Sequence, residues 1–259
     1  MNQSKLVMSR LQEANRSVEA LEPLAPNAID VVTGYCMQCQ ALDQRLAGGE
    51  RLTGWKIAFA GSAAQKRFGI TEPVFGALTN AMRVDAGSTV KLSRLIAPKL
   101  EVELAFVLGR TLVPGDYEDR DILAAISDVA PAFEIADCRW QNWRFEVGAF
   151  LADNAASGLY CLGPTVAFDP EAHACTTYAL HRGEVACGAG DTEGREDTPQ
   201  VNLCWLIRRL LADGHPVEAG QIVLSGALLP PLDIQPAAYR LQMLGMELAM
   251  VFEADTHAV

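Results

Sequence analysis

The sequence lacks the features of a membrane, secreted or nucleic-acid-binding protein. Its 259 residues contain 21 Lys and Arg against 32 Asp and Glu, a net charge of −11, so there is no excess of basic side chains to bind phosphates. No apolar run reaches the ~20 residues of a membrane helix. The N-terminus MNQSKLVMSR has no apolar segment of the signal-peptide type. These absences predict a cytoplasmic protein with neither a membrane nor a nucleic-acid partner.

Cysteine and histidine patterns typical of zinc or disulfide folds are also missing. The seven cysteines are scattered and odd in number, which favours free thiols over a disulfide framework. Cys36 and Cys39 form one CxxC pair inside a helical pattern, with no second pair, and we interpret them as two small helix residues rather than a redox or zinc site. The histidines, which lie in or beside predicted turns and form no cluster, are His173, His181, His215 and His257.

The chain reads as one continuous α+β domain. Half of its residues are hydrophobic and a fifth are charged, which is typical of a globular protein. Helices are predicted over 4–21, 28–47, 119–129 and 199–213, with a short one opened by Ser62; strands are predicted over 54–60, 101–109, 131–136, 158–164, 221–226 and 244–252. Strands without regular βα alternation favour a mostly β core over a Rossmann sheet. We therefore expect an N-terminal helical region at 1–50 and a β region at 51–259.

Two acidic residues share one face of a predicted strand. Side chains alternate along a strand, so Glu101 and Glu103 project together, about 6–7 Å apart along the chain. The opposite, apolar face consists of Val102, Leu104, Phe106 and Leu108. Two carboxylates this close repel each other unless a proton or a cation relieves them. A solvated strand face is the alternative, but Ala105 and Val107 continue the acidic face and favour a partly covered site.

A third carboxylate, Glu134, lies inside an apolar strand, where an unpaired charge is costly. It requires an arginine, a hydrogen-bond network or a metal ion. Together with Glu101 and Glu103 it would suit a hard ion such as Mg²⁺ or Mn²⁺ rather than zinc. The nearby Asp137 and Arg139 are interpreted as a structural ion pair in preference to catalytic groups.

Two further polar positions stand in apolar surroundings. Lys56 lies within GWKIAFA, so it either extends its ammonium group to the surface or meets an anion in a pocket. Asp153 and Asn154 precede another apolar strand, where they form a turn or part of a site.

Seven sequence blocks, in this order and spacing, resemble a known family. They are GWKIAFA (54–60), EPVFGAL (72–78), IAPKLEVELAFVLGR (96–110), PAFEIADCRW (131–140), LADNAASGLYCLG (151–163), VLSGAL (223–228) and LGMELAMVF (244–252). Over roughly residues 28–253 the chain resembles the 2-keto-4-pentenoate hydratase group of the fumarylacetoacetate hydrolase superfamily.

The resemblance implies a fold, a cofactor and a reaction. The fold is a mixed β-sandwich roll with packed helices and an N-terminal helical region, in a homo-oligomer. Three acidic residues bind Mg²⁺ or Mn²⁺, and they fall on Glu101, Glu103 and Glu134. The catalytic positions fall on Lys56, Asp153, Asn154 and Ser157. The substrate is a 2-oxo acid, or its dienol, from aromatic meta-cleavage, and a lyase of the hydratase type adds water to it to give a 4-hydroxy-2-oxo acid.

The chain also departs from the family pattern. Val74 replaces an acidic residue common in hydratases, and Ala58 and Phe59 stand where the lysine block usually continues with glycine. A decarboxylase of the 4-oxalocrotonate type, acting on a 2-oxo dicarboxylic acid, is therefore the alternative, with Arg139 and Arg144 as candidates to bind its second carboxylate. A further alternative is a non-catalytic subunit that assembles with a paralogous hydratase or decarboxylase. C–C bond hydrolysis is disfavoured by the lack of a clear Glu–His pair.

Overall fold

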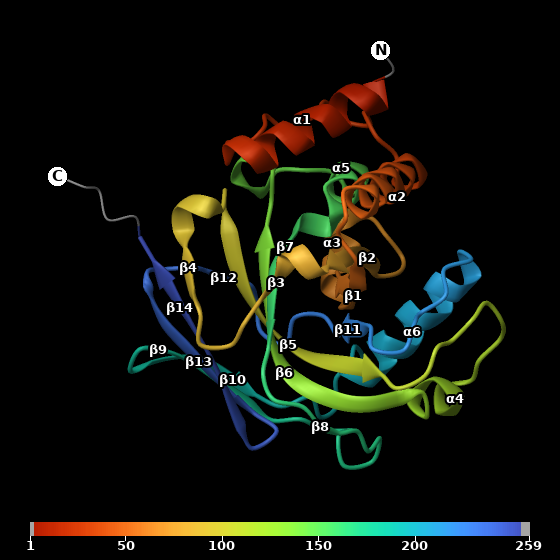
Figure 1. Ribbon diagram of the computed structural model, residues 1–259, viewed down its shortest axis with the longest axis vertical. Helices are drawn as coiled ribbons and strands as arrows, with labels where there is room; N and C mark the ends of the chain where they lie inside the picture. Colours follow the sequence, from red (N-terminus) through yellow and green to blue (C-terminus); the bar gives the residue numbers. More distant parts are fainter. Residues whose placement is uncertain (1–2, 255–259) are drawn as a thin grey trace.

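Two sheets form the body of the protein in the computed structural model, which describes residues 3–254 (Figure 1). Strands of the larger sheet are β1 Leu52–Ala58, β2 Val74–Thr79, β3 Arg83–Val84, β5 Pro98–Leu108, β6 Ile126–Asp137, β7 Ser157–Leu162, β8 Val166–Ala167, β11 Ile222–Leu224 and β12 Leu232–Asp233. Their order is β2-β1-β11-β5-β6-β7-β3, with β12 on β5 and β8 on β6. Strands of the smaller sheet, β10-β9-β13-β14-β4, are β4 Thr89–Lys91, β9 Tyr178–Arg182, β10 Val185–Gly190, β13 Ala237–Met243 and β14 Met246–Glu253.

Helices surround the larger sheet. They are α1 Gln3–Ser17, α2 Val31–Ala47, α3 Ser62–Phe68, α4 Asp119–Leu123, α5 Val147–Ala152 and α6 Pro199–Ala212, with 3₁₀ turns η1 Asn80–Met82, η2 Leu92–Arg94, η3 Gln141–Trp143 and η4 Asn154–Ala156. α1, α2 and α5 gather at one end of the molecule (Figure 1). Gln38, buried in α2, donates hydrogen bonds to the carbonyls of Phe75 in β2, at 2.9 Å, and of Leu151 in α5, at 3.4 Å. This side chain ties α2 to the sheet and to α5.

The longest strands, β5 and β6, separate an apolar face from a polar one. Register pairs Glu101 with Glu134 and Glu103 with Ala132, so these side chains lie on the same face. Ala105 of β5 pairs with Leu224 of β11, and Leu224 pairs with Lys56 of β1. Lys56 therefore lies on that face too. The opposite face joins the main core through the fully buried side chains of Val102, Leu104, Phe106 and Leu108.

The polar face is the inside of a curled sheet. Thr53 of β1 and Tyr160 of β7 are not neighbours in the strand order, yet their hydroxyl groups are hydrogen-bonded at 2.9 Å. A sheet must curl for these two strands to meet. The curl brings Lys56 of β1 towards the carboxylates of β5 and β6.

The predicted α+β class, with two sheets and packed helices, is confirmed, and most predicted elements are present. The predicted helix at 119–129 is wrong in its second half: α4 ends at Leu123, and β6 begins at Ile126 because residues from there on pair with β5. Among the strands longer than three residues, the sequence did not predict β2, β9, β10 or β13, in which small and polar residues interrupt the apolar pattern. The division at 1–50 and 51–259 stays a prediction.

Candidate metal centre and active site

Three carboxylates meet on the inner face of the larger sheet. Glu101 and Glu103 come from β5 and Glu134 comes from β6, and one oxygen of each lies within 4.8 Å of the others. Glu103 and Glu134 are completely buried, and Glu101 is half-buried. The backbone N–H of Gly226 donates to Glu103 Oε2 at 2.8 Å. A solvated strand face, the alternative left open by the sequence, is therefore wrong at Glu103.

Lys56 is the cation that faces this acidic trio. Its side chain is 2% exposed, and its Nζ lies 2.7 Å from Glu134 Oε1. Burial alone would lower the pKa of Lys56, but the nearby carboxylates, Glu134 above all, raise it. The side chain is therefore a buried ammonium group rather than a lysine that reaches the surface.

The trio contains more negative charge than Lys56 balances. Burial and the Glu134 carboxylate raise the pKa of Glu101 to about 7, and burial with both neighbouring carboxylates raises the pKa of Glu103 well above its usual range. Within residues 3–254, Glu103 Oε1 and Glu134 Oε2 accept no hydrogen bond. Buried carboxylate oxygens without donors are costly. An all-oxygen, anionic donor set of this kind fits Mg²⁺ or Mn²⁺.

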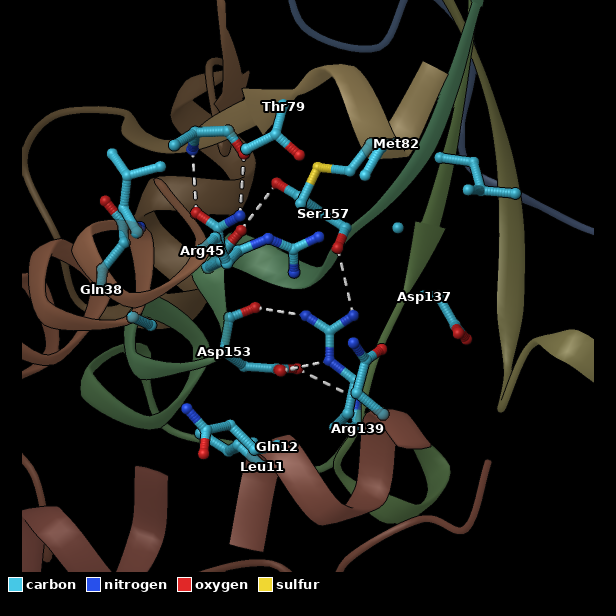
Figure 2. A pocket seen from close by; sticks show the side chains of 18 of the residues that line it. Leu11, Gln12, Gln38, Arg45, Thr79, Met82, Asp137, Arg139, Asp153 and Ser157 are labelled. Atoms are coloured by element: carbon cyan, nitrogen blue, oxygen red, sulfur yellow. Dashed lines mark hydrogen bonds and ion pairs between the residues drawn. The ribbon is translucent and has the colours of Figure 1, made fainter. Parts of the chain in front are cut away.

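The other candidate residues lie around a separate cavity of about 250 Å³ between α1, α2 and the start of β7 (Figure 2). Asp153, Asn154 and Ser157 line it, whereas Lys56 and the acidic trio do not. Asn154 pairs its side-chain amide with the backbone N–H and carbonyl of Ala77, both at 2.8 Å. Ser157 Oγ donates to the Asn154 carbonyl at 2.7 Å. The catalytic role of these three residues stays a prediction.

The interpretation of Asp137 and Arg139 as an ion pair is wrong, because Arg139 pairs with Asp153 (Figure 2). The Asp137 carboxylate instead accepts hydrogen bonds from the backbone N–H groups of Ile96 and Ala97, at 3.0 and 2.7 Å. β6 extends through Asp137, so this side chain turns towards the segment that leads into β5, away from the guanidinium of Arg139.

Arg139 clamps a strained turn. Its guanidinium donates to the carbonyls of Asp153, at 2.6 Å, and Ser157, at 3.1 Å, on either side of η4. The residues between, Asn154, Ala155 and Ala156, have φ angles of 53°, 51° and 55°. A left-handed conformation costs about 1–2 kcal/mol for each such non-glycine residue. The hydrogen bonds from Arg139 offset part of that cost; the sequence did not predict them.

The clamped turn packs against the strand beside Lys56. Gly76 is the register partner of Lys56, and a Cβ atom at Gly76 would lie 2.5 Å from the Asn154 carbonyl oxygen and 2.6 Å from Ser157 Oγ. Val74, two residues earlier on the same face, is buried in an apolar cluster. The turn can therefore pack closely beside Lys56 because residue 76 is a glycine. The side chain at position 74 is a valine and supplies no carboxylate to the site.

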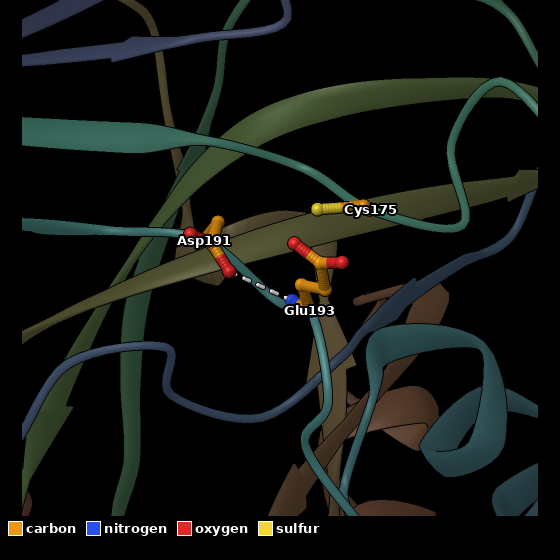
Figure 3. A group of neighbouring side chains, drawn as sticks. All are labelled: Cys175, Asp191 and Glu193. Carbon is orange, nitrogen blue, oxygen red and sulfur yellow. Dashed lines mark hydrogen bonds between the residues drawn. The ribbon is translucent and has the colours of Figure 1, made fainter.

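A second acidic group, formed by Cys175, Asp191 and Glu193, lies on the surface (Figure 3). All three side chains are exposed, and the Glu193 backbone N–H donates to Asp191 Oδ1 at 2.9 Å. Water solvates these groups, so their charge requires no ion. His257, one of the histidines considered above, lies outside the described residues.

Comparisons with known proteins place the chain among enzymes. No family model matches it. It is 34% identical to the 2-keto-4-pentenoate hydratase of Burkholderia vietnamiensis (strain G4 / LMG 22486), over 88% of each chain. It is also 34% identical to the 2-hydroxyhexa-2,4-dienoate hydratase of Comamonas testosteroni, again over 88% of each chain. The 4-oxalocrotonate decarboxylase from Pseudomonas putida G7, complexed with magnesium and adipate, has a TM-score of 0.90 at 21% identity, with 96% of this chain and 97% of that one covered. That structural likeness shows the fold.

Replacement of Arg139 by Gln should destabilise the protein strongly. The change leaves Asp153 buried without its partner, which typically costs about 3–5 kcal/mol. We expect the midpoint of urea unfolding to fall, and Asp153→Asn in the same chain to restore part of the loss. Arg16→Gln, which removes the exposed ion pair with Glu13, is the matched control and should leave the midpoint unchanged. Equal midpoints for the two single variants would contradict the clamp.

Stability without metal should fall as pH rises. The raised pKa of Glu101, about 7 against an ordinary 4.5, means that its protonated form stabilises the fold. This contribution is complete below about pH 4.5 and is lost as pH rises through 7. We expect chelator-treated protein to melt at a lower temperature at pH 8 than at pH 5.5, and Mn²⁺ to raise the melting temperature more at pH 8. Glu101→Gln should reduce the difference in melting temperature between the two pH values. If Mn²⁺ raises the melting temperature equally at pH 5.5 and at pH 8, the account is refuted.

Proposed function

The chain belongs to the 2-keto-4-pentenoate hydratase family, and we propose that it is a metal-dependent lyase in aromatic meta-cleavage catabolism. The reaction adds water to a 2-hydroxy-2,4-dienoate, or to the corresponding 2-oxo-enoate, and gives a 4-hydroxy-2-oxo acid. The observation that supports this proposal most directly is the buried acidic trio of Glu101, Glu103 and Glu134 with Lys56 beside it. Relatives over most of the chain are named hydratases of this substrate class.

Glu101, Glu103 and Glu134 would hold Mg²⁺ or Mn²⁺. Their burial, their raised pKa values and the unpaired oxygens of Glu103 and Glu134 support this assignment. A divalent ion supplies Lewis-acid chemistry when bound, polarising the 2-oxo group of a 2-oxo acid. The decarboxylase with the same fold is complexed with magnesium.

Lys56 places its positively charged ammonium group beside the trio. In the reaction the 2-hydroxyl proton leaves and C5 gains a proton, which converts the dienol to the conjugated 2-oxo-3-enoate; water then adds its oxygen to C4 and a proton to C3. We assign to Lys56 Nζ a proton transfer in this sequence and the balance of the substrate's negative charge. The catalytic role predicted for Asp153, Asn154 and Ser157 stays part of the proposal. Their polar atoms bond to Arg139 and to backbone, so these residues also shape the turn beside Gly76.

Hydration is favoured over the decarboxylase alternative. A second substrate carboxylate requires a free cation, and the guanidinium of Arg139 is already bound to Asp153 and Ser157. Arg144 is exposed to solvent. Because Val74 is buried among apolar side chains, another group must activate the water. A non-catalytic subunit that binds no metal ion would keep the destabilising buried carboxylates of the trio without any function for them.

Setting and assembly rest on the family resemblance. We propose a cytoplasmic homo-oligomer, with assembly alongside a paralogous decarboxylase or hydratase as the alternative. Among residues 3–254, the helices are all too short or too polar to cross a membrane.

Turnover of freshly prepared 2-hydroxypenta-2,4-dienoate tests the proposal. We expect Mg²⁺ or Mn²⁺ to accelerate loss of the dienol's ultraviolet absorbance, chelator to stop it, and 4-hydroxy-2-oxopentanoate to form. Glu103→Gln should lower kcat/KM by at least about 100-fold, because a lost ligand weakens metal binding and its effect on the substrate. Glu193→Gln, in the exposed acidic group, is the matched control and should retain the activity.

Two results would contradict the proposal. If hydration persists in the presence of chelator, the reaction does not require a metal ion. Release of CO₂ from a dicarboxylic 2-oxo acid, without hydration of the dienol, would establish the decarboxylase alternative instead.

A further inference from the structure

The two fully buried carboxylates of the acidic trio each have one oxygen engaged by a donor and one oxygen without a hydrogen bond. Glu103 Oε2 accepts the backbone N–H of Gly226 at 2.8 Å, and Glu134 Oε1 lies 2.7 Å from the ammonium group of Lys56. Within residues 3–254, the second oxygens, Glu103 Oε1 and Glu134 Oε2, accept no hydrogen bond. Each of these side chains therefore presents a single unengaged oxygen to a metal ion.

The N–H that reaches Glu103 belongs to a loop that follows β11. β11 pairs with β5 up to the residue before Ser225. Ser225 continues the contact with β5, because its backbone N–H donates to the carbonyl of Leu104 at 3.0 Å and its Oγ accepts the N–H of Leu104 at 3.1 Å. Gly226 then has a φ angle of 92°, in the left-handed region that favours glycine. The chain thus turns away from the sheet at the residue whose N–H binds Glu103.

Asn202, near the start of α6, holds this loop in place. Its side chain is 5% exposed, and its Nδ2 donates to the carbonyl of Ser225 at 2.8 Å and to that of Asp197 at 3.3 Å. The Ser225 carbonyl and the Gly226 N–H belong to one planar peptide unit, so a bond that fixes the carbonyl also fixes the direction of the N–H. Asn202 is therefore a positioning residue that acts on Glu103 through this peptide.

We propose that Asn202, through the Ser225–Gly226 peptide, restricts Glu103 to one metal-binding oxygen and so favours Mg²⁺ or Mn²⁺ over Ca²⁺. This inference rests on the proposed function, which places the ion at the acidic trio. Mg²⁺ and Mn²⁺ prefer octahedral sites of oxygen ligands, whereas Ca²⁺ takes more oxygens in a looser geometry and often binds a carboxylate through both of its oxygens. A carboxylate with one oxygen fixed on an N–H group lacks the freedom to offer both.

Metal titrations of the full-length protein, freed of metal by chelator and dialysis, test this role independently of turnover. The Kd for Mn²⁺ is measured from the electron paramagnetic resonance signal of the free ion, and the Kd for Ca²⁺ by competition with Mn²⁺. We define the selectivity ratio as the Kd for Ca²⁺ divided by the Kd for Mn²⁺.

Asn202→Leu removes the amide donor at similar side-chain volume. We expect it to raise the Kd for Mn²⁺ about tenfold, the scale on which loss of a hydrogen-bond partner behind a metal ligand acts. The Kd for Ca²⁺ should change less, because a released Glu103 can bind Ca²⁺ through both oxygens, and the selectivity ratio should fall at least about threefold.

Gly226→Ala disturbs the same N–H by a second route. A Cβ atom at Gly226 would meet its nearest neighbour, Asn202 Nδ2, at 3.4 Å, so the space admits it, but a φ angle of 92° is unfavourable for alanine and the peptide should rotate. The selectivity ratio should fall in this variant too. If Asn202→Leu fails to fold, Gly226→Ala decides the question.

Gln38→Leu is the matched control. Gln38 is also buried, and its amide also donates to two backbone carbonyls, at 2.9 and 3.4 Å, but these belong to β2 and α5. Its loss should lower the melting temperature about as much as Asn202→Leu does and leave the selectivity ratio at the wild-type value.

The outcomes separate this inference from the proposed function. An unchanged selectivity ratio in Asn202→Leu and Gly226→Ala, including an equal loss of affinity for both ions, overturns the inference and leaves the proposed function standing. An equal fall of the ratio in Gln38→Leu would show a general effect of destabilisation and would also overturn it. If the wild type binds no Mn²⁺, the proposed function fails and the inference fails with it.

Discussion

An imbalance of charge in a buried place is the constraint on which the site depends. Glu101, Glu103 and Glu134 are held within 4.8 Å of one another, and Lys56 offers a single positive charge against them. The raised pKa values of Glu101 and Glu103 express the cost of that arrangement. Crowded carboxylates destabilise the fold, and this cost is offset only when a cation and an anionic substrate complete the site. This is why the trio, rather than any single residue, supports the functional proposal.

The fold enforces the crowding through register and curvature. Glu101 and Glu134 are direct partners across β5 and β6, so neither can turn away without breaking the longest pairing in the larger sheet. The sheet curls so that Thr53 of β1 and Tyr160 of β7 form a hydrogen bond, and this curl brings Lys56 of β1 close to the carboxylates. On the other side of Lys56, the Arg139 clamp holds a left-handed turn against Gly76. Rigid strands thus hold the charged groups, while the strained turn of residues 154–156 shapes their surroundings.

The sequence predicted the charged groups better than the shape around them. Glu134 and Lys56 stood out because each interrupts an apolar strand, and alternation along β5 placed Glu101 and Glu103 on one face. Arg139 and Asp153 are 14 residues apart across a turn, so only the folded chain shows that they pair and that Asp137 does not take part. The stacking of Phe59, Phe68, Phe145 and Phe150 was not predicted for a similar reason: these residues come from separate segments, and each alone resembles an ordinary core residue. The second half of the predicted helix at 119–129 failed because pairing with β5 outweighed the local pattern.

Anomalous X-ray diffraction from crystals grown with Mn²⁺ tests the central claim most directly. The account predicts an anomalous difference peak among the carboxylates of Glu101, Glu103 and Glu134, and its loss in Glu103→Gln. A peak confined to the exposed group of Cys175, Asp191 and Glu193, or no peak at the trio under saturating Mn²⁺, would contradict it.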